Sequence, residues 1–376
     1  MRHTKIEHFE REHIDAHHNS ALSVTEGVSD QPIVNPGYVR KRRRRLTTDD
    51  YVNGILAGNI TILSQAITLI ESANADHYAQ AQQIIERCLP HSGGSIRVGI
   101  TGVPGAGKSS FIEAIGGLVT RLRYKLAVLA IDPSSERSGG SILGDKTRME
   151  SISANNNVFI RPSPSAGSLG GVARKTRETI ILCEAAGFDA IFIETVGVGQ
   201  SETAVHSMVD IFTMLQISGA GDELQGIKRG IMEMSDMMII TKADGDNVLR
   251  AKMARSQYAN ALMLFPTPES GLRPEVYTCS SVDKTGLEEV WKGIEDYIAH
   301  VKSSGHFTKR RQDQLHYWMR ETIHATLLSD FYNNASVSAH FSAYENNVLE
   351  ERITPFIAAR ELLDKFFESK IEDQID

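Results

Sequence analysis

The feature that most constrains this chain is the glycine-rich run 102–109, with the sequence GVPGAGKS. It follows the apolar stretch 96–101 and precedes the stretch 111–115, so the pattern G-x-x-x-x-G-K-[ST] lies between a predicted strand and a predicted helix. Glycines allow a tight turn in which backbone N–H groups converge on phosphates at the positive end of a helix. The run is therefore predicted to be a P-loop that binds a nucleoside triphosphate.

The members of this run have distinct expected roles. Lys108 is expected to reach the β and γ phosphates, and the Ser109 hydroxyl to ligate Mg²⁺. A chance glycine-rich turn is the alternative, and the agreement of motif, order and flanking elements disfavours it. The other residues predicted to contact the nucleotide here are Gly102, Val103, Pro104, Gly105, Ala106, Gly107 and Ser110.

Composition excludes several classes of protein. The net charge of −7 provides no global field that would attract nucleic acid or an anionic membrane. No apolar run approaches the roughly 20 residues that span a bilayer. The three cysteines, Cys88, Cys183 and Cys279, form no C-x-x-C pair and no disulfide framework, which suits a reducing compartment. We expect a soluble cytoplasmic protein without nucleic-acid or membrane partners.

The chain divides into four predicted parts. Residues 1–45 are predicted to be a disordered polar and basic tail with five of the thirteen histidines. Metal binding by these histidines, or phosphate binding by the basic run 40–45, is possible chemistry, but a solvated tail is preferred. Helical spacing predicts an N-terminal helical segment at 46–94, opened by the cap Thr47, and amphipathic helices at 301–376 that pack on the main domain or on a second copy.

Between these helical parts, residues 95–300 alternate between strands and helices. Continuous apolar runs of this kind are typical of strands that are buried on both faces of a parallel sheet. The fold class is therefore predicted to be α/β, with a doubly wound and mostly parallel sheet whose ligands lie at the C-terminal ends of its strands. The predicted strands are 96–101, 126–131, 157–160, 189–194, 211–217, 236–241 and 275–279.

The stretch 241–244, TKAD, identifies the base. It resembles the guanine-reading [NT]-K-x-D motif, in which a carboxylate, here Asp244, accepts from guanine N1–H and the exocyclic amine. The stem of Lys242 would lie against the base. Ser280 and Ser281 follow a later strand, where a backbone N–H favours guanine O6. Together with the P-loop, these residues predict GTP rather than ATP.

Three acidic residues are expected on the metal side. Asp132 and Glu194 end predicted strands, and Asp145 lies in the stretch 144–148. Carboxylate oxygens are ligands that Mg²⁺ prefers, so these acids and Ser109 are predicted to hold it directly or through water. Gly197 is placed to offer its backbone N–H to the γ-phosphate. Helix caps and turn acids are the alternative interpretation.

These stretches closely resemble the methylmalonyl-CoA mutase-associated GTPases, the MeaB family, which is also known as ArgK or LAO/AO transport kinase. The family belongs to a group of P-loop GTPases that includes nickel-enzyme metallochaperones. The resemblance covers about residues 46–376, and the tail lies outside it. It rests on the stretches 102–109, 132–135, 139–149, 194–202 and 221–228.

The resemblance implies a homodimer held by C-terminal helices. It also implies a GTP-hydrolysing chaperone that gates cofactor loading into adenosylcobalamin-dependent methylmalonyl-CoA mutase and protects that enzyme. By position, the catalytic residues are Lys108, Asp132, Glu194 and Lys228, and a partner-responsive switch loop at 219–228 contains Asp222 and Lys228. The family usually has Asn where this chain has Thr241. Because that Asn braces the P-loop, weaker nucleotide binding is expected here.

Two other functions remain as alternatives. A nickel-type metallochaperone GTPase would need a Cys/His site near the nucleotide, whereas the cysteines are scattered and the histidines cluster in the tail. An ATP-dependent kinase linked to lysine, arginine and ornithine transport is disfavoured by Asp244.

Overall fold

The computed structural model describes residues 46–72, 74–131, 149–162, 169–195, 201–219 and 229–372. Its first helix begins at a capping box, because the Thr47 hydroxyl accepts from the Asp50 amide while the Asp50 carboxylate accepts from the Thr47 amide. Within the predicted N-terminal helical segment, the first helix ends before Gly58, which has φ 72°, and Asn59 caps a second helix. The N-terminal helices are α1 (Thr48–Leu56), α2 (Ile60–Glu71), α3 (Ala75–Cys88) and the 3₁₀ turn η1 (Leu89–His91).

The centre of the fold is a seven-stranded sheet with the order β3-β2-β4-β1-β5-β6-β7, and every strand pair is parallel. All seven strands lie where the sequence predicted them, with ends that differ by at most one residue. They are β1 (Ile96–Gly102), β2 (Leu126–Ile131), β3 (Val158–Arg161), β4 (Ala190–Thr195), β5 (Ile211–Gln216), β6 (Met237–Ile240) and β7 (Glu275–Thr278). The prediction of an α/β fold with a parallel sheet is confirmed, and within the described strands the sheet is wholly parallel.

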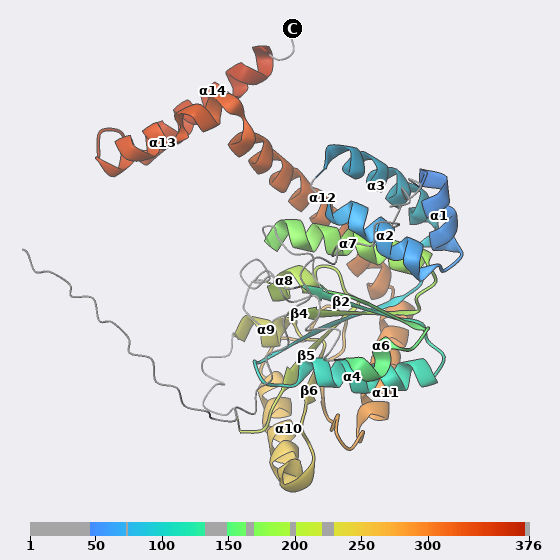
Figure 1. The fold of residues 1–376 in the computed structure, drawn as a ribbon. Helices are drawn as coiled ribbons and strands as arrows, with labels where there is room; N and C mark the ends of the chain where they lie inside the picture. The colour runs from blue at the N-terminus through green and yellow to red at the C-terminus, as the bar shows by residue number, and fades with distance from the viewer. Residues whose placement is uncertain are drawn as a thin grey trace, which may run out of the picture. The chain divides into compact units, whose positions relative to one another are not determined.

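Helices cover both faces of this sheet (Figure 1). Side chains of α4, α6 and α11 pack on one face, and those of α1–α3, α7, α8 and α10 pack on the other. Alternation along β2 explains this double burial, because Val128 points to the first face and Leu129 to the second. The bounds are α4 (Lys108–Arg121), α6 (Glu150–Ser153), α7 (Leu169–Ala185), α8 (Ser201–His206), α9 (Arg229–Met234), η4 (Gly245–Asn247), α10 (Val248–Leu262) and α11 (Leu287–Ser303).

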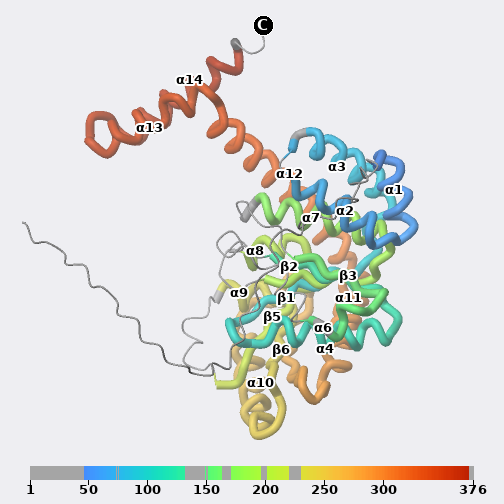
Figure 2. The backbone as a smooth tube through the Cα atoms, viewed as in Figure 1, coloured from blue at the N-terminus to red at the C-terminus, as the bar shows by residue number. Residues whose placement is uncertain are grey.

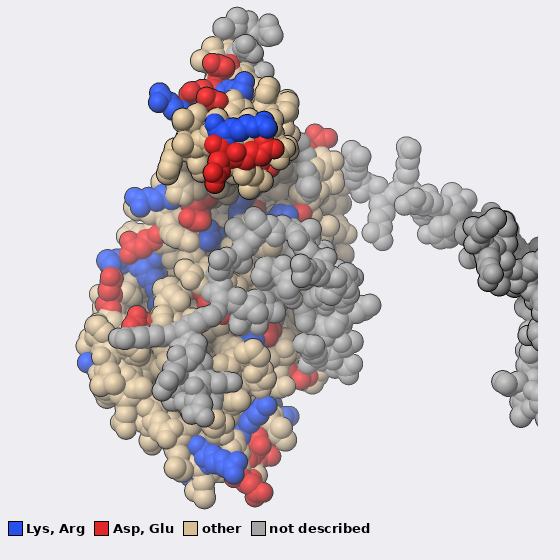
Figure 3. Space-filling model, turned by 90° about the vertical axis from the view of Figure 1, so that its left-hand side faces the viewer, with Lys and Arg blue, Asp and Glu red and all other residues tan. Residues whose placement is uncertain are grey.

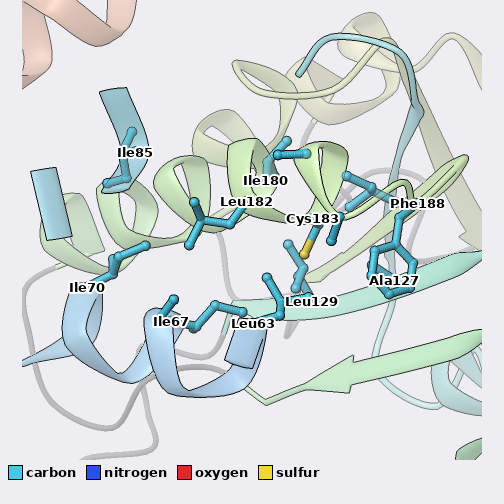
Figure 4. Close-up of a cluster of buried hydrophobic side chains, with 14 of the residues drawn as sticks. Leu63, Ile67, Ile70, Ile85, Ala127, Leu129, Ile180, Leu182, Cys183 and Phe188 are labelled. Atoms are coloured by element: carbon cyan, nitrogen blue, oxygen red, sulfur yellow. The ribbon is translucent and has the colours of Figure 1, made fainter. Parts of the chain in front are cut away.

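The N-terminal helices join the main core through α7. Figure 4 shows Leu63, Ile67 and Ile70 of α2 and Ile85 of α3 directed toward α7 and β2. Leu63 and Ile67 are completely buried. Burying a side chain of this size contributes on the order of 2 kcal/mol, so α2 is stabilised by the sheet layer rather than by its own helical propensity.

The chain ends in three helices, α12 (His306–Asn333), α13 (Ala335–Leu349) and α14 (Pro355–Glu372). Figure 2 traces the backbone from α11 into α12 and then to α13 and α14. The first turns of α12 are held by two ion pairs, Arg310 with Asp236 at 2.9 Å and Arg311 with Asp210 at 2.8 Å. Asp210 directly precedes β5 and Asp236 directly precedes β6. The start of α12 is therefore fixed at the N-terminal ends of these strands, whereas the P-loop lies at the C-terminal ends.

The described surface carries charges of both signs side by side (Figure 3). No helix among the described residues is long and apolar enough to cross a membrane. The predicted tail, residues 1–45, lies outside the described residues.

Candidate nucleotide-binding site

The predicted P-loop connects β1 to α4 at the C-terminal edge of the sheet. A Cβ on Gly102 would lie 2.5 Å from the Leu215 carbonyl oxygen, so only glycine lets β1 approach β5 this closely. Gly105 and Gly107 have φ values of 80° and 78°, a backbone conformation that residues with a side chain rarely adopt. The glycines of the motif are thus required by the shape of the turn itself.

The loop leaves the beginning of α4 open. Gly107 is the N-cap, and no side chain of the described residues caps this helix. Helix N-termini carry unpaired N–H groups and a partial positive charge, which together attract phosphate. Ala106 is buried, Val103 is partly buried, and Pro104, Gly105 and Ser110 are exposed. The open side of the loop therefore presents backbone groups and small side chains.

Lys108 lies across the loop, and its ammonium donates a hydrogen bond of 3.0 Å to the Gly102 carbonyl oxygen. Burial lowers the pKa of this lysine, while the carboxylates of Glu194 and Glu202 oppose the shift. The ammonium is thus held in a partly desolvated position where an added phosphate would strengthen its charged form.

The metal side brings together Ser109 and Glu194, whose side chains come from α4 and β4. The Ser109 hydroxyl donates to Glu194 Oε1 at 3.3 Å. A hydroxyl oxygen and a carboxylate oxygen are hard ligands of the kind that Mg²⁺ prefers, so Ser109 and Glu194 together fit a Mg²⁺ site. Beside it, Thr195 Oγ1 donates to Thr101 Oγ1 at 2.9 Å, which ties the ends of β4 and β1 together.

Other predicted members of the site lie in segments that the structure leaves undescribed. These are the metal candidates Asp132 and Asp145, the γ-phosphate candidate Gly197, and the switch residues Asp222 and Lys228. Among the described residues, no group of three or more His, Cys, Asp or Glu side chains is arranged to hold a metal ion.

The predicted guanine-reading loop follows β6 and lies beside the P-loop. Asp244 is oriented by Ser280, whose hydroxyl donates to Asp244 Oδ2 at 2.6 Å. The same Ser280 oxygen accepts from the amides of Val282 and Asp283, so it organises the turn that contains the partly buried Ser281. The structure therefore brings together the two sequence regions that were predicted to read guanine.

Lys242 and Thr241 connect this loop to the P-loop. Lys242 has φ 56°, and its Cε would lie 4.0 Å from a Cβ on Gly107. The Thr241 hydroxyl lies 2.7 Å from the Ala106 carbonyl oxygen and 3.1 Å from that of Gln216. Thr241 thus braces the P-loop through its hydroxyl, the role that the family's Asn is expected to have at this position.

Three residues of this region were not singled out by sequence reasoning. Glu202 is 1% exposed and its charge acts on Lys108. Asn247 and Ser218 support the guanine-reading loop through their side chains. Glu202 could have been predicted, because it belongs to the stretch 194–202 that carries the family resemblance. No sequence spacing links Ser218 to Asn247.

Sequence comparison places this chain among known proteins. Residues 63–336 match the family model described as methylmalonyl Co-A mutase-associated GTPase MeaB. A protein of Mycobacterium tuberculosis named as a probable GTPase is 46% identical over 318 residues, which are 85% of this chain and 95% of that protein. The mouse methylmalonic aciduria type A homolog, a mitochondrial protein, is 41% identical over 356 residues, which are 92% of this chain and 83% of that protein.

A solved structure agrees with these sequence matches. The crystal structure of an LAO/AO transport system kinase superposes with a TM-score of 0.68 at 36% identity. The match covers 84% of this chain and 96% of that one, so the likeness extends beyond the sheet to the flanking helices.

Proposed function

This chain belongs to the MeaB family of methylmalonyl-CoA mutase-associated GTPases, and we propose that it is a GTP-dependent chaperone of an adenosylcobalamin-dependent methylmalonyl-CoA mutase. The protein is a GTPase. Its biological effect is proposed to be a change in the conformation of the partner, not the release of GDP and phosphate. In that role it gates cofactor loading and protects the mutase from inactivation. The observation that best supports this site is the direct contact between the P-loop and the guanine-reading loop, Thr241 to Ala106.

The proposed hydrolysis depends on positioning and electrostatics. The N-terminus of α4 and the Lys108 ammonium bind the phosphates and offset the negative charge that develops as the γ-phosphoryl group leaves. Asp244 accepts from guanine, with its carboxylate oriented by Ser280. Mg²⁺, held by Ser109 and Glu194 and by Asp132 and Asp145, would supply additional neutralising charge when bound.

The partner is proposed to act through the loop at 219–228. Lys228 would approach the phosphates only when the mutase is bound, and Asp222 would respond to the same contact. Because Lys228 is proposed to act in the complex, Lys228→Ala should leave basal hydrolysis nearly unchanged and remove stimulation by the mutase. Equal stimulation of the variant and the parent would overturn this part of the proposal.

The chain is also proposed to be a homodimer in the cytoplasm, joined through α12–α14. These helices expose large apolar side chains, among them Leu328 at 59%, Phe356 at 86% and Phe367 at 59%. A hollow of about 790 Å³ lies among them and is lined mostly by apolar residues. A second copy of the chain would cover this surface.

Affinity capture of purified methylmalonyl-CoA mutase tests the proposal. The full chain is immobilised and exposed to the mutase with GTP, with GDP and without nucleotide, and the retained mutase is quantified. Retention that depends on the nucleotide is expected. The Asp244→Asn variant serves as a matched control, because xanthosine triphosphate should replace GTP in controlling retention. Absence of the mutase under all conditions would contradict the chaperone function.

A further inference from the structure

The guanine-reading loop is held by a residue outside its motif, Asn247 of η4. The Asn247 side-chain Nδ2 donates a hydrogen bond of 2.7 Å to the Lys242 carbonyl oxygen. Its backbone amide donates to the Asp244 carbonyl oxygen at 2.9 Å. One residue thus fixes the backbone on both sides of Ala243, including that of the acid that reads the base.

The bond to Lys242 is made where the backbone needs support. Lys242 has φ 56°, in the left-handed region that non-glycine residues rarely adopt. The conformation directs the Lys242 side chain toward Gly107 of the P-loop. The Asn247 amide supports the Lys242 carbonyl in this conformation.

The Lys242 carbonyl determines which way the Asn247 amide faces, because a carbonyl oxygen can only accept and Nδ2 is the donor end of the amide. The other end of the amide, Oδ1, then accepts a hydrogen bond of 2.6 Å from the Ser218 hydroxyl. Ser218 lies two residues beyond β5, and the base-reading loop is thereby tied to the end of a central strand.

We propose that Asn247 is a specificity-determining positioning residue for the guanine base, and that Ser218 supports its amide through a hydrogen bond to Oδ1. Ser280 holds the carboxylate of Asp244, whereas Asn247 holds its backbone. Recognition of two N–H groups of guanine by one carboxylate requires placement within about 0.5 Å. The inference rests on the proposed function in one respect, that residues 241–244 read guanine.

Nucleotide discrimination by the full chain tests the role of Asn247. Inosine triphosphate lacks the exocyclic amine of guanine, so the ratio of GTP to inosine triphosphate affinity reports how well Asp244 is placed. Asn247→Ala should lower this ratio about 5- to 10-fold and leave ATP affinity unchanged. Asn247→Asp should do the same, because an ionised carboxylate cannot donate to the Lys242 carbonyl. Ser218→Ala should lower the ratio less, since the Lys242 carbonyl still orients the amide and only the bond to Oδ1 is lost.

Asn260→Ala and Ser256→Ala, at exposed positions of α10, are matched controls that should keep the ratio of the parent. A thermal unfolding scan of each variant separates misfolding from misplacement. Retention of the ratio in either Asn247 variant would overturn the inference while leaving the GTPase assignment intact. Equal affinity of the unmodified chain for GTP and ATP would instead overturn the proposed guanine site itself.

Discussion

The Thr241 hydroxyl donates a hydrogen bond of 2.7 Å to the Ala106 carbonyl oxygen, across 135 residues of sequence. Both residues are buried, and the contact joins the loop that reads the base to the loop that binds the phosphates. Loss of this hydrogen bond should therefore alter the loop that binds the phosphates as well as the loop that reads the base.

Thr241→Val should weaken GTP binding about 10-fold, because the isosteric valine leaves the Ala106 carbonyl without its donor. Thr241→Ser retains the hydroxyl and is the matched control. Thr241→Asn should bind within a few-fold of the parent, since an amide can make the same contact. Isothermal titration calorimetry measures all three. Unchanged affinity in Thr241→Val would show that the brace is dispensable.

Asp244→Asn should lose at least about 100-fold in GTP affinity, because two hydrogen bonds to a charged acceptor are affected. The amide presents a donor where the exocyclic amine of guanine needs an acceptor. Xanthine, which carries an oxygen there, should become the preferred base. Competition binding with GTP and xanthosine triphosphate measures the exchange, and a variant that still prefers GTP would contradict the role of Asp244.

Lys108→Ala should abolish GTP turnover and leave the fold intact. Burial already disfavours the charged ammonium, so its removal costs the protein without nucleotide little stability. Phosphate release measures turnover, and circular dichroism checks the fold. Lys252→Ala, at an exposed position of α10, should behave like the parent. An unchanged rate in Lys108→Ala would refute the P-loop assignment.

The full-length chain should scatter light as a dimer, with twice the mass of 41.5 kDa. Deletion of residues 335–376 should give a monomer or an insoluble protein while α12 stays anchored through Arg310 and Arg311. The double substitution Leu363→Glu and Phe367→Glu should also give a monomer, with Glu368→Gln as its control. A full-length monomer at micromolar concentration would refute this prediction.

His206 should make the fold sensitive to acid. Burial, followed by the Arg310 cation, lowers the pKa of His206 to about 4. On acidification, His206 of the unfolded chain is protonated at a higher pH than His206 of the folded chain. The contribution of His206 to the free energy of unfolding is therefore fully present above pH 6.5 and is lost as the pH falls toward 4. The loss should be on the order of 2 kcal/mol for this partly exposed ring. His206→Gln should flatten the unfolding free energy over this pH range, and a parallel decline in the variant would exclude His206 as the cause.

Local patterns were sufficient for the architecture of this chain. Most strands are continuous apolar runs that alternate along the chain with helical periods, so a parallel sheet was predictable without knowing the strand order. The P-loop was predictable for the same reason. Its glycines, Lys108 and Ser109 all lie within the eight residues 102–109, so the motif can be recognised without any distant residue.

The tertiary structure decided the contacts between distant segments. The contacts of Ser218 with Asn247 and of Thr241 with Ala106, and the placement of the Glu202 charge where it acts on Lys108, depend on which strands lie side by side and in what register. Sequence spacing therefore determined the fold class and the phosphate loop of this protein. Only the folded chain determined how its base-reading loop is held, because the bonds to Ala106, Ser218 and Ser280 join segments that follow different strands.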